Sequence, residues 1–159
     1  MQNFSCLGWL KLLNYTFPGG RPADRLASRP NLKLMLTSAQ LGQLGLGLSL
    51  ATRIRLDRSD LNLHRYTIGS SDSPECACHA KQESSYHYII DCFLYDCERQ
   101  ILFDSVEYYI PDFRKLGKRK KFEIITIGIN IQNPDFYYTN YNISIAVQKY
   151  IFKTKRFPT

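Results

Sequence analysis

Residues 76–92 read CACHAKQESSYHYIIDC, and this stretch holds most of the metal-binding residue types of the chain. Two cysteines stand one residue apart at its start, a histidine follows further along, and a third cysteine closes it. Three thiols and one imidazole are a full ligand set for a tetrahedral zinc ion. The residues that we predict as zinc ligands are Cys76, Cys78, His87 and Cys92. Because four protein ligands fill every position around the ion, we expect a structural site without a zinc-bound water for hydrolysis.

Two further residues of this region compete for a place in the site. His79 directly follows Cys78 and cannot easily chelate the same ion, so His87 is preferred. Cys97 falls on an apolar helix face, where we expect it to pack as a small hydrophobic side chain. Four of the five cysteines lie between Cys76 and Cys97 with histidine among them, which favours metal binding in a reducing compartment over a disulfide framework.

A long helix is predicted directly after the Cys-x-Cys arm. Apolar residues recur at three- and four-residue steps from Ser85 to Tyr109, before a proline, and a serine at 84 or 85 suits the N-cap. His87 and Cys92 both fall at the start of this helix, but residues five apart do not share one face of a regular helix. We therefore expect a frayed or tightened first turn.

The domain organisation follows from the periodic segments on either side. Prolines and a glycine pair without a lasting period predict a poorly ordered leader over residues 1–32. Residues 33–157 are expected to form a small, mainly α domain that carries the Cys-x-Cys zinc knuckle or hairpin. The Ile-rich segment 122–131 fits either a strand or a buried helix, because periodicity alone does not separate the two. A last helix is predicted over residues 142–152, with positive charge at its C-terminus.

Basic residues form two clusters along the chain of 159 residues, whose formal net charge is +7. A positive balance favours acidic partners such as RNA or DNA. The residues that we predict as phosphate contacts are Arg53, Arg55, Arg58, Arg65, Lys118, Arg119, Lys120 and Lys121. Each cluster also fits a simpler interpretation, in which the arginines lie on a solvated helix face beside aspartates and the second cluster is a solvated helix start.

Several short segments occur in a fixed order: RIRL at 53–56, LNLHR at 61–65, CAC at 76–78, ESSYHYIIDC at 83–92, YDCER at 95–99, AVQKYI at 146–151 and KTKRF at 153–157. This order resembles the zinc-binding C-terminal segment of reverse transcriptases from non-LTR retrotransposons, over roughly residues 33–157. The resemblance implies a Cys/Cys/His/Cys zinc knuckle that helps the polymerase hold RNA or DNA. On this sequence the implied ligands are the same four residues. The chain departs from the family pattern at His79 and Phe93, where many members have glycine and proline.

A non-catalytic function is expected from the remaining residues. No catalytic constellation is apparent in the sequence, and the polymerase and endonuclease regions of the resembling family are absent. We therefore expect a zinc-stabilised nucleic-acid-binding module, a C-terminal fragment of a retrotransposon reverse transcriptase, that is not an enzyme by itself. The alternative is a protein-interaction module or an inactive relic in which zinc only holds the fold. No signal peptide or membrane span is predicted, so an intracellular location, cytoplasmic or nuclear, is expected.

Overall fold

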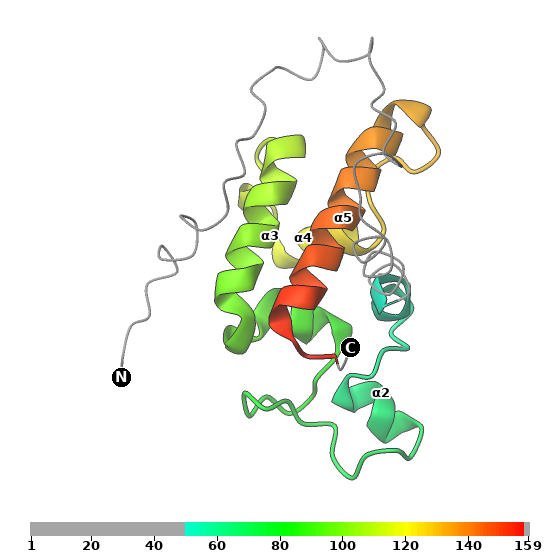
Figure 1. Ribbon diagram of the computed structural model, residues 1–159, viewed down its shortest axis with the longest axis vertical. Coiled ribbons are helices and arrows are strands. Elements are labelled where there is room, and N and C mark those ends of the chain that lie inside the picture. Colours follow the sequence, from blue (N-terminus) through cyan, green and yellow to red (C-terminus); the bar gives the residue numbers. More distant parts are fainter. Residues whose placement is uncertain (1–49, 158–159) are drawn as a thin grey trace, which may run out of the picture. The chain divides into compact units, whose positions relative to one another are not determined.

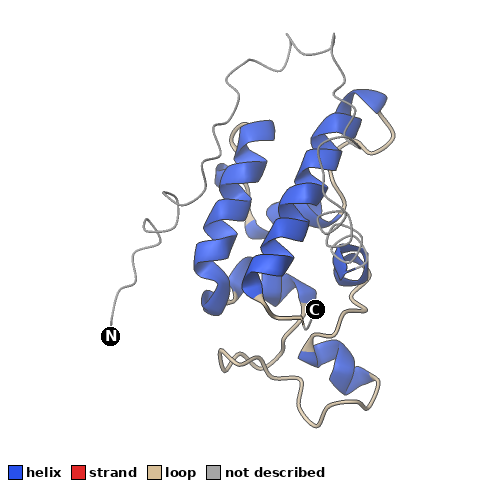
Figure 2. Cartoon of the chain, in the orientation of Figure 1, coloured by secondary structure: helices blue, strands red, loops and turns tan. Residues whose placement is uncertain are grey.

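The computed structural model describes residues 50–157, and this range forms helices and loops without strands (Figure 1 and Figure 2). The mainly α fold predicted from the sequence is confirmed. The predicted leader, residues 1–32, and the first part of the predicted domain lie outside the described residues. The elements are a helical stretch at 50–55, α2 (Asn62–Thr67), a π turn (His87–Asp91), a 3₁₀ turn (Phe93–Tyr95), α3 (Asp96–Tyr109), a 3₁₀ turn (Phe113–Lys115), α4 (Lys118–Thr126), a 3₁₀ turn (Pro134–Phe136) and α5 (Tyr137–Thr154).

The apolar core is centred on α3 and α5, which lie side by side (Figure 1). Burying one large apolar side chain contributes roughly 1.5–3 kcal/mol to stability. The core side chains of these two helices are Leu102, Phe103, Val106, Ile143, Ala146, Val147, Tyr150 and Ile151. Within the described range, no residue of the loop 68–84 belongs to this core. That loop must therefore be held by other interactions.

The prediction of one helix from Ser85 to Tyr109 is wrong, because the chain is interrupted at Cys92. The residues before Cys92 form the π turn, Cys92 is extended (φ −66°, ψ 115°), and a 3₁₀ turn precedes α3. The interruption changes which side chains face the core. Phe93 and Leu94 are 61% and 45% exposed. Cys97 is exposed as well, so its predicted packing on the apolar face is also wrong.

Side chains from α3 and α5 donate hydrogen bonds to backbone carbonyls at the interruption, where the carbonyl of Cys92 also accepts the N–H of Tyr95 at 3.3 Å. Arg99 is 5% exposed, and its Nε–H donates to the carbonyl oxygen of Ile89 at 2.8 Å. Its Nη2 donates to the carbonyl oxygen of Cys92. The hydroxyl of Tyr150 donates to the carbonyl oxygen of Tyr88 at 2.7 Å. Since a buried carbonyl without a partner is costly, these two side chains explain how the interruption persists inside the domain.

The Ile-rich segment 122–131 is helical at its start, because α4 covers its first residues and buries two isoleucines. The chain then turns at Gly128, which has a φ of +97°. A Cβ at this position would lie 2.6 Å from Oδ1 of Asn140. The Asn140 amide bonds both the N–H and the carbonyl of Ile129, at 2.9 and 2.8 Å. Glycine is therefore needed for α4 to end against α5.

The last helix is longer than predicted, since α5 extends beyond both ends of the range 142–152. It follows a 3₁₀ turn in which the Asn133 side chain accepts the N–H of Asp135 at 3.0 Å. It ends at Lys155, whose left-handed conformation (φ 50°) closes the helix, and Lys153 lies in its last turn. This cation matches the predicted positive charge at the C-terminus. Among residues 50–157, no helix combines the length and the apolar character that crossing a bilayer requires.

Candidate metal centre

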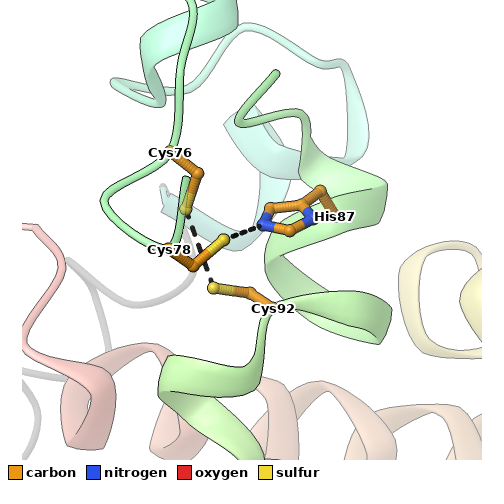
Figure 3. Close-up of side chains that lie close together, drawn as sticks. All are labelled: Cys76, Cys78, His87 and Cys92. Atoms are coloured by element: carbon orange, nitrogen blue, oxygen red, sulfur yellow. Dashed lines mark hydrogen bonds between the residues drawn. The ribbon is translucent and has the colours of Figure 1, made fainter. Parts of the chain in front are cut away.

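The Cys-x-Cys arm is a tight turn in the loop between α2 and the π turn (Figure 3). The N–H of Cys76 donates to the carbonyl of Ala80 at 3.0 Å, and the N–H of His79 donates to the carbonyl of Cys76 at 2.8 Å. His79 adopts a left-handed conformation (φ 66°) and is exposed. The turn thus directs Cys76 and Cys78 toward the π turn, while His79 stays outside the cluster.

The π turn explains how the side chains of His87 and Cys92 converge on the same point. Residues five apart in a regular α-helix are rotated by about 140° around its axis. Here the N–H of Cys92 donates to the carbonyl of His87 at 2.8 Å, which is the five-residue bond of a π turn. The hydroxyl of Ser84 accepts the N–H of His87 at 3.1 Å and supports the start of the turn. The first turn is therefore widened, and not frayed or tightened as predicted.

The four predicted ligands converge in the structure. Their ligand atoms all lie within 4.8 Å of one another. Cys76 Sγ is 3.7 Å from Cys92 Sγ, and Cys78 Sγ is 3.1 Å from His87 Nε2. Two sulfurs bound to one tetrahedral zinc ion are about 3.8 Å apart, so this arrangement fits a metal ion such as zinc. Cys76 and Cys92 are 4% and 0% exposed, whereas Cys78 and His87 are half-buried at the rim.

Burial shapes the protonation of the three thiols when no cation is bound. Desolvation raises the pKa of Cys92 to about 12, and it also raises the pKa of Cys76. Desolvation acts in the same direction at Cys78, but the Ala80 N–H and the neighbouring thiols stabilise its thiolate, so the pKa of Cys78 is lowered overall. A bound cation must displace the remaining thiol protons, so metal affinity is expected to fall as the pH falls.

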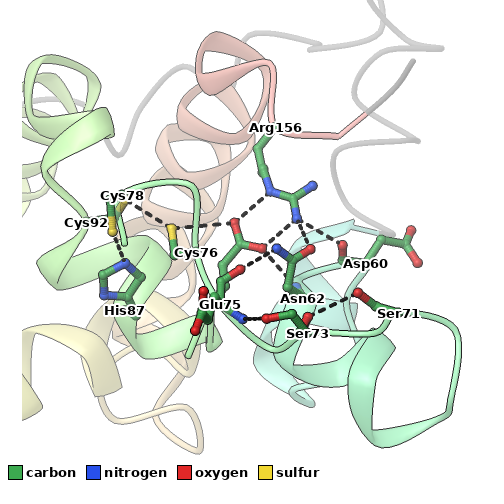
Figure 4. Close-up of polar contacts among 11 residues, drawn as sticks. Asp60, Asn62, Ser71, Ser73, Glu75, Cys76, Cys78, His87, Cys92 and Arg156 are labelled. Atoms are coloured by element: carbon green, nitrogen blue, oxygen red, sulfur yellow. Dashed lines mark hydrogen bonds and ion pairs between the residues drawn. The ribbon is translucent and has the colours of Figure 1, made fainter. Parts of the chain in front are cut away.

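Two residues outside the predicted site lie directly beside it (Figure 4). The Nε of Arg156 donates to Glu83 Oε1 at 2.7 Å, and its Nη2 donates to Oε2 at 2.5 Å. Glu83 Oε1 is also 4.0 Å from Cys76 Sγ. The sequence indicated Arg156 only as part of the basic C-terminus. No local spacing could have identified the pair, because the two residues are 73 positions apart.

The first predicted phosphate-contact cluster surrounds the start of α2. Arg53, Arg55, Arg58 and Arg65 are all exposed. Arg53 forms an ion pair with Asp60 at 3.2 Å, as the simpler interpretation expects. Arg65 donates to the carbonyl oxygen of Ser70 at 3.3 Å, and contact of the four arginines with phosphate stays a prediction.

The second cluster forms the first turn of α4. Lys118 pairs with Asp91 of the π turn at 2.8 Å, and Lys120 pairs with Glu123 at 3.0 Å. Arg119 is exposed, and Lys121 Nζ lies 5.6 Å from the centroid of the Phe103 ring. The Lys118–Asp91 pair joins this basic turn to the segment that carries His87 and Cys92. Phosphate contact by these residues also stays a prediction.

The two neighbouring histidines give a direct test of the ligand set. His87→Ala removes a ligand and should weaken zinc binding by more than the roughly 10–100-fold that loss of an outer-shell partner costs. His79→Asn is the matched control, because asparagine tolerates the left-handed backbone of residue 79. It is expected to leave the affinity unchanged. Competition with a chromogenic chelator measures both values, and equal losses in the two variants would contradict the assignment of His87.

No family model, curated protein or solved structure matches the chain. The sequence and geometry by themselves establish a small helical domain, without strands over residues 50–157, in which three cysteines and one histidine form a cluster able to hold a metal ion.

Proposed function

We propose that the cluster binds zinc and that the ion has a structural role. The supporting observation is the convergence of three sulfurs and one imidazole nitrogen within 4.8 Å. This soft donor set suits zinc, and four protein ligands leave no position for a reactive water. When bound, the ion supplies a cross-link between the Cys-x-Cys arm and the π turn. The module is therefore proposed to be non-catalytic by itself.

We further propose that the module binds RNA or DNA inside the cell, as the C-terminal segment of a retrotransposon reverse transcriptase. Three observations support this proposal: the net charge of +7, the exposed cations near α2 and on α4, and the ordered motifs that resemble that family. Lys118 and Asp91 link the basic turn of α4 to the metal-binding segment. Metal binding would thereby position cations that face a phosphate backbone.

A protein-interaction module is the second candidate, and two observations favour it. Several proposed phosphate contacts are already paired with carboxylates, which reduces the charge that they offer to a polyanion. Tyr137, Tyr138 and Tyr141 on α5 are 60%, 68% and 43% exposed. Exposed tyrosines are enriched at protein interfaces. An inactive relic would bind neither nucleic acid nor a protein partner.

Nucleic-acid binding is tested by its salt dependence on the zinc-loaded, full-length protein. Fluorescence anisotropy with labelled single-stranded RNA, single-stranded DNA and duplex DNA gives the affinity at each salt concentration. If four phosphates are contacted on a single strand, affinity should fall about 50-fold between about 50 and 200 mM salt. Salt-independent binding, or no binding at low salt, would count against the proposal.

The variant that carries this test replaces two cations of α4. Arg119→Gln/Lys120→Gln should reduce the slope of log affinity against log salt by about 1.4, or roughly 0.7 for each lost contact to a single strand. Lys149→Gln/Lys153→Gln removes the same charge from exposed positions on α5 and should leave the slope unchanged. A protein partner retained after residues 118–121 are neutralised would instead favour the second candidate.

A further inference from the structure

A buried carboxylate and the last arginine of the chain form a closed hydrogen-bonded unit next to the metal centre (Figure 4). The side chain of Glu83 is 2% exposed and that of Arg156 is 21% exposed. The guanidinium contacts both carboxylate oxygens, at 2.7 and 2.5 Å. Its Nη2 also donates to Asn62 Oδ1 at 3.1 Å. The N–H of Asn62 donates to Glu83 Oε2 at 2.8 Å, which completes the unit.

The backbone of Glu83 joins this unit to the residues just before the Cys-x-Cys arm and to α2. Its N–H donates to the carbonyl of Pro74 at 2.8 Å, and its carbonyl accepts the N–H of Leu63 at 3.3 Å. Pro74 lies two residues before Cys76, so the bond from Glu83 closes the loop that contains the arm. A side chain that holds Glu83 therefore also holds the position of Cys76.

The charges around Cys76 make the guanidinium important for the metal as well as for the loop. A zinc ion with three thiolates and a neutral imidazole carries a net charge of −1. Glu83 adds a second negative charge, with its Oε1 only 4.0 Å from Cys76 Sγ. A nearby negative charge disfavours a thiolate, and burial reduces the screening of that repulsion by water. Arg156 is the cation that contacts both oxygens of this carboxylate.

We propose that Arg156 is a positioning residue of the metal centre, which sets its affinity by neutralising Glu83 beside Cys76. This inference rests on the proposed metal site and is independent of nucleic-acid binding. It makes the turn after α5 part of a centre whose ligands lie more than sixty positions earlier in the chain. The planar fork of arginine matches both carboxylate oxygens, which the ammonium of lysine cannot do.

The test is a Co²⁺ titration of the full-length protein, in which thiolate-to-cobalt absorption reports binding at the sulfurs. Arg156→Ala is expected to lower the affinity by about 10–100-fold, as loss of an outer-shell partner does. Glu83→Gln/Arg156→Ala should recover most of this loss, because the glutamine no longer repels the Cys76 thiolate. Arg156→Lys keeps the charge but loses the bidentate contact, so its affinity should lie between those of Arg156→Ala and the unmodified protein. Arg114→Ala removes an exposed arginine that pairs with Asp104, and it should leave the affinity unchanged.

The outcomes distinguish a failure of the proposed metal site from a failure of the proposed role of Arg156. If the unmodified protein shows no thiolate-to-cobalt absorption, the proposed metal site itself is wrong. If it binds Co²⁺ and Arg156→Ala binds equally well, only the role of Arg156 is overturned. If Arg156→Ala and Glu83→Gln/Arg156→Ala lose the same Co²⁺ affinity, the charge mechanism is also overturned. Both variants lack the hydrogen bonds from Arg156 to Glu83, so equal losses would mean that these bonds act only by holding the loop. Far-UV circular dichroism confirms that each variant retains its helices, and Arg156→Lys provides a folded comparison if Arg156→Ala does not.

Discussion

Removal of zinc from the full-length protein with excess chelator is expected to lower the free energy of unfolding by about 4 kcal/mol, relative to protein held at free zinc a thousand times the dissociation constant. The reason is that only the folded chain brings the Cys-x-Cys arm and the π turn together. The loop 68–84 contributes no residue to the apolar core, so a bound ion would add a second cross-link to the helices beside the Glu83–Arg156 pair. Urea unfolding with and without chelator measures the difference.

Metal removal should increase the rate of hydrogen exchange most in the segments that carry the four ligands. Hydrogen exchange is expected to accelerate at the amides of the loop and of the π turn, while α3 and α5 stay protected by their packing. Cys92→Ser should reproduce the chelated state and should no longer respond to added zinc. His79→Asn is the matched control and should respond as the unmodified protein does. Identical melting of zinc-loaded and chelated protein would show that the cluster contributes nothing to folding.

The four residues of the cluster could be predicted from the sequence because the decisive information is local. The four residues lie within the short stretch 76–92, and three cysteines with one histidine have few chemical functions other than metal binding. The choice of His87 over His79 needed only the steric argument that adjacent residues rarely chelate one ion. The mainly α fold was accessible for the same reason, since apolar periodicity marks the faces of α3 and α5.

The interruption of the long helix could not be predicted, because its causes are distant in sequence. Tyr150 bonds the carbonyl of Tyr88 from 62 positions away, and Arg99 lies on the buried face of α3 although its charge predicts an exposed position. Apolar periodicity shows which residues can face a core. It does not show that a buried guanidinium will donate to backbone carbonyls in place of helix hydrogen bonds. The five-residue spacing of His87 and Cys92 was the one local signal of irregular backbone. This spacing predicts a frayed or tightened turn and not a π turn, because a π turn has no characteristic composition.

Arg99→Ala is expected to destabilise the protein by about 1.5–3 kcal/mol, the contribution of hydrogen bonds from a charged group, because the Asp96 carboxylate that it leaves unpaired is 59% exposed. The side chain donates to the carbonyls of Ile89 and Cys92 and to the carboxylate of Asp96. Its loss leaves two carbonyl oxygens without these donors at the point where the helix is interrupted. Urea unfolding at saturating zinc isolates this effect from that of the metal. Arg114→Ala, at an exposed ion pair, should cost less than about 1 kcal/mol.

Arg99→Ala should also weaken zinc binding, because the π turn forms only if the helix stays interrupted at Cys92. Without Arg99, the segment can lower its energy by continuing as a regular α-helix, which would rotate His87 and Cys92 about 140° apart. Arg99→Lys keeps one positive charge but cannot donate to three acceptors in a fork, so it should recover neither property fully.

A variant that loses stability but keeps its zinc affinity would mean that the ligands themselves impose the π turn. A variant within about 1 kcal/mol of the unmodified protein would mean that water or backbone rearrangement satisfies the two carbonyls, since a buried carbonyl left unpaired costs about 1–3 kcal/mol.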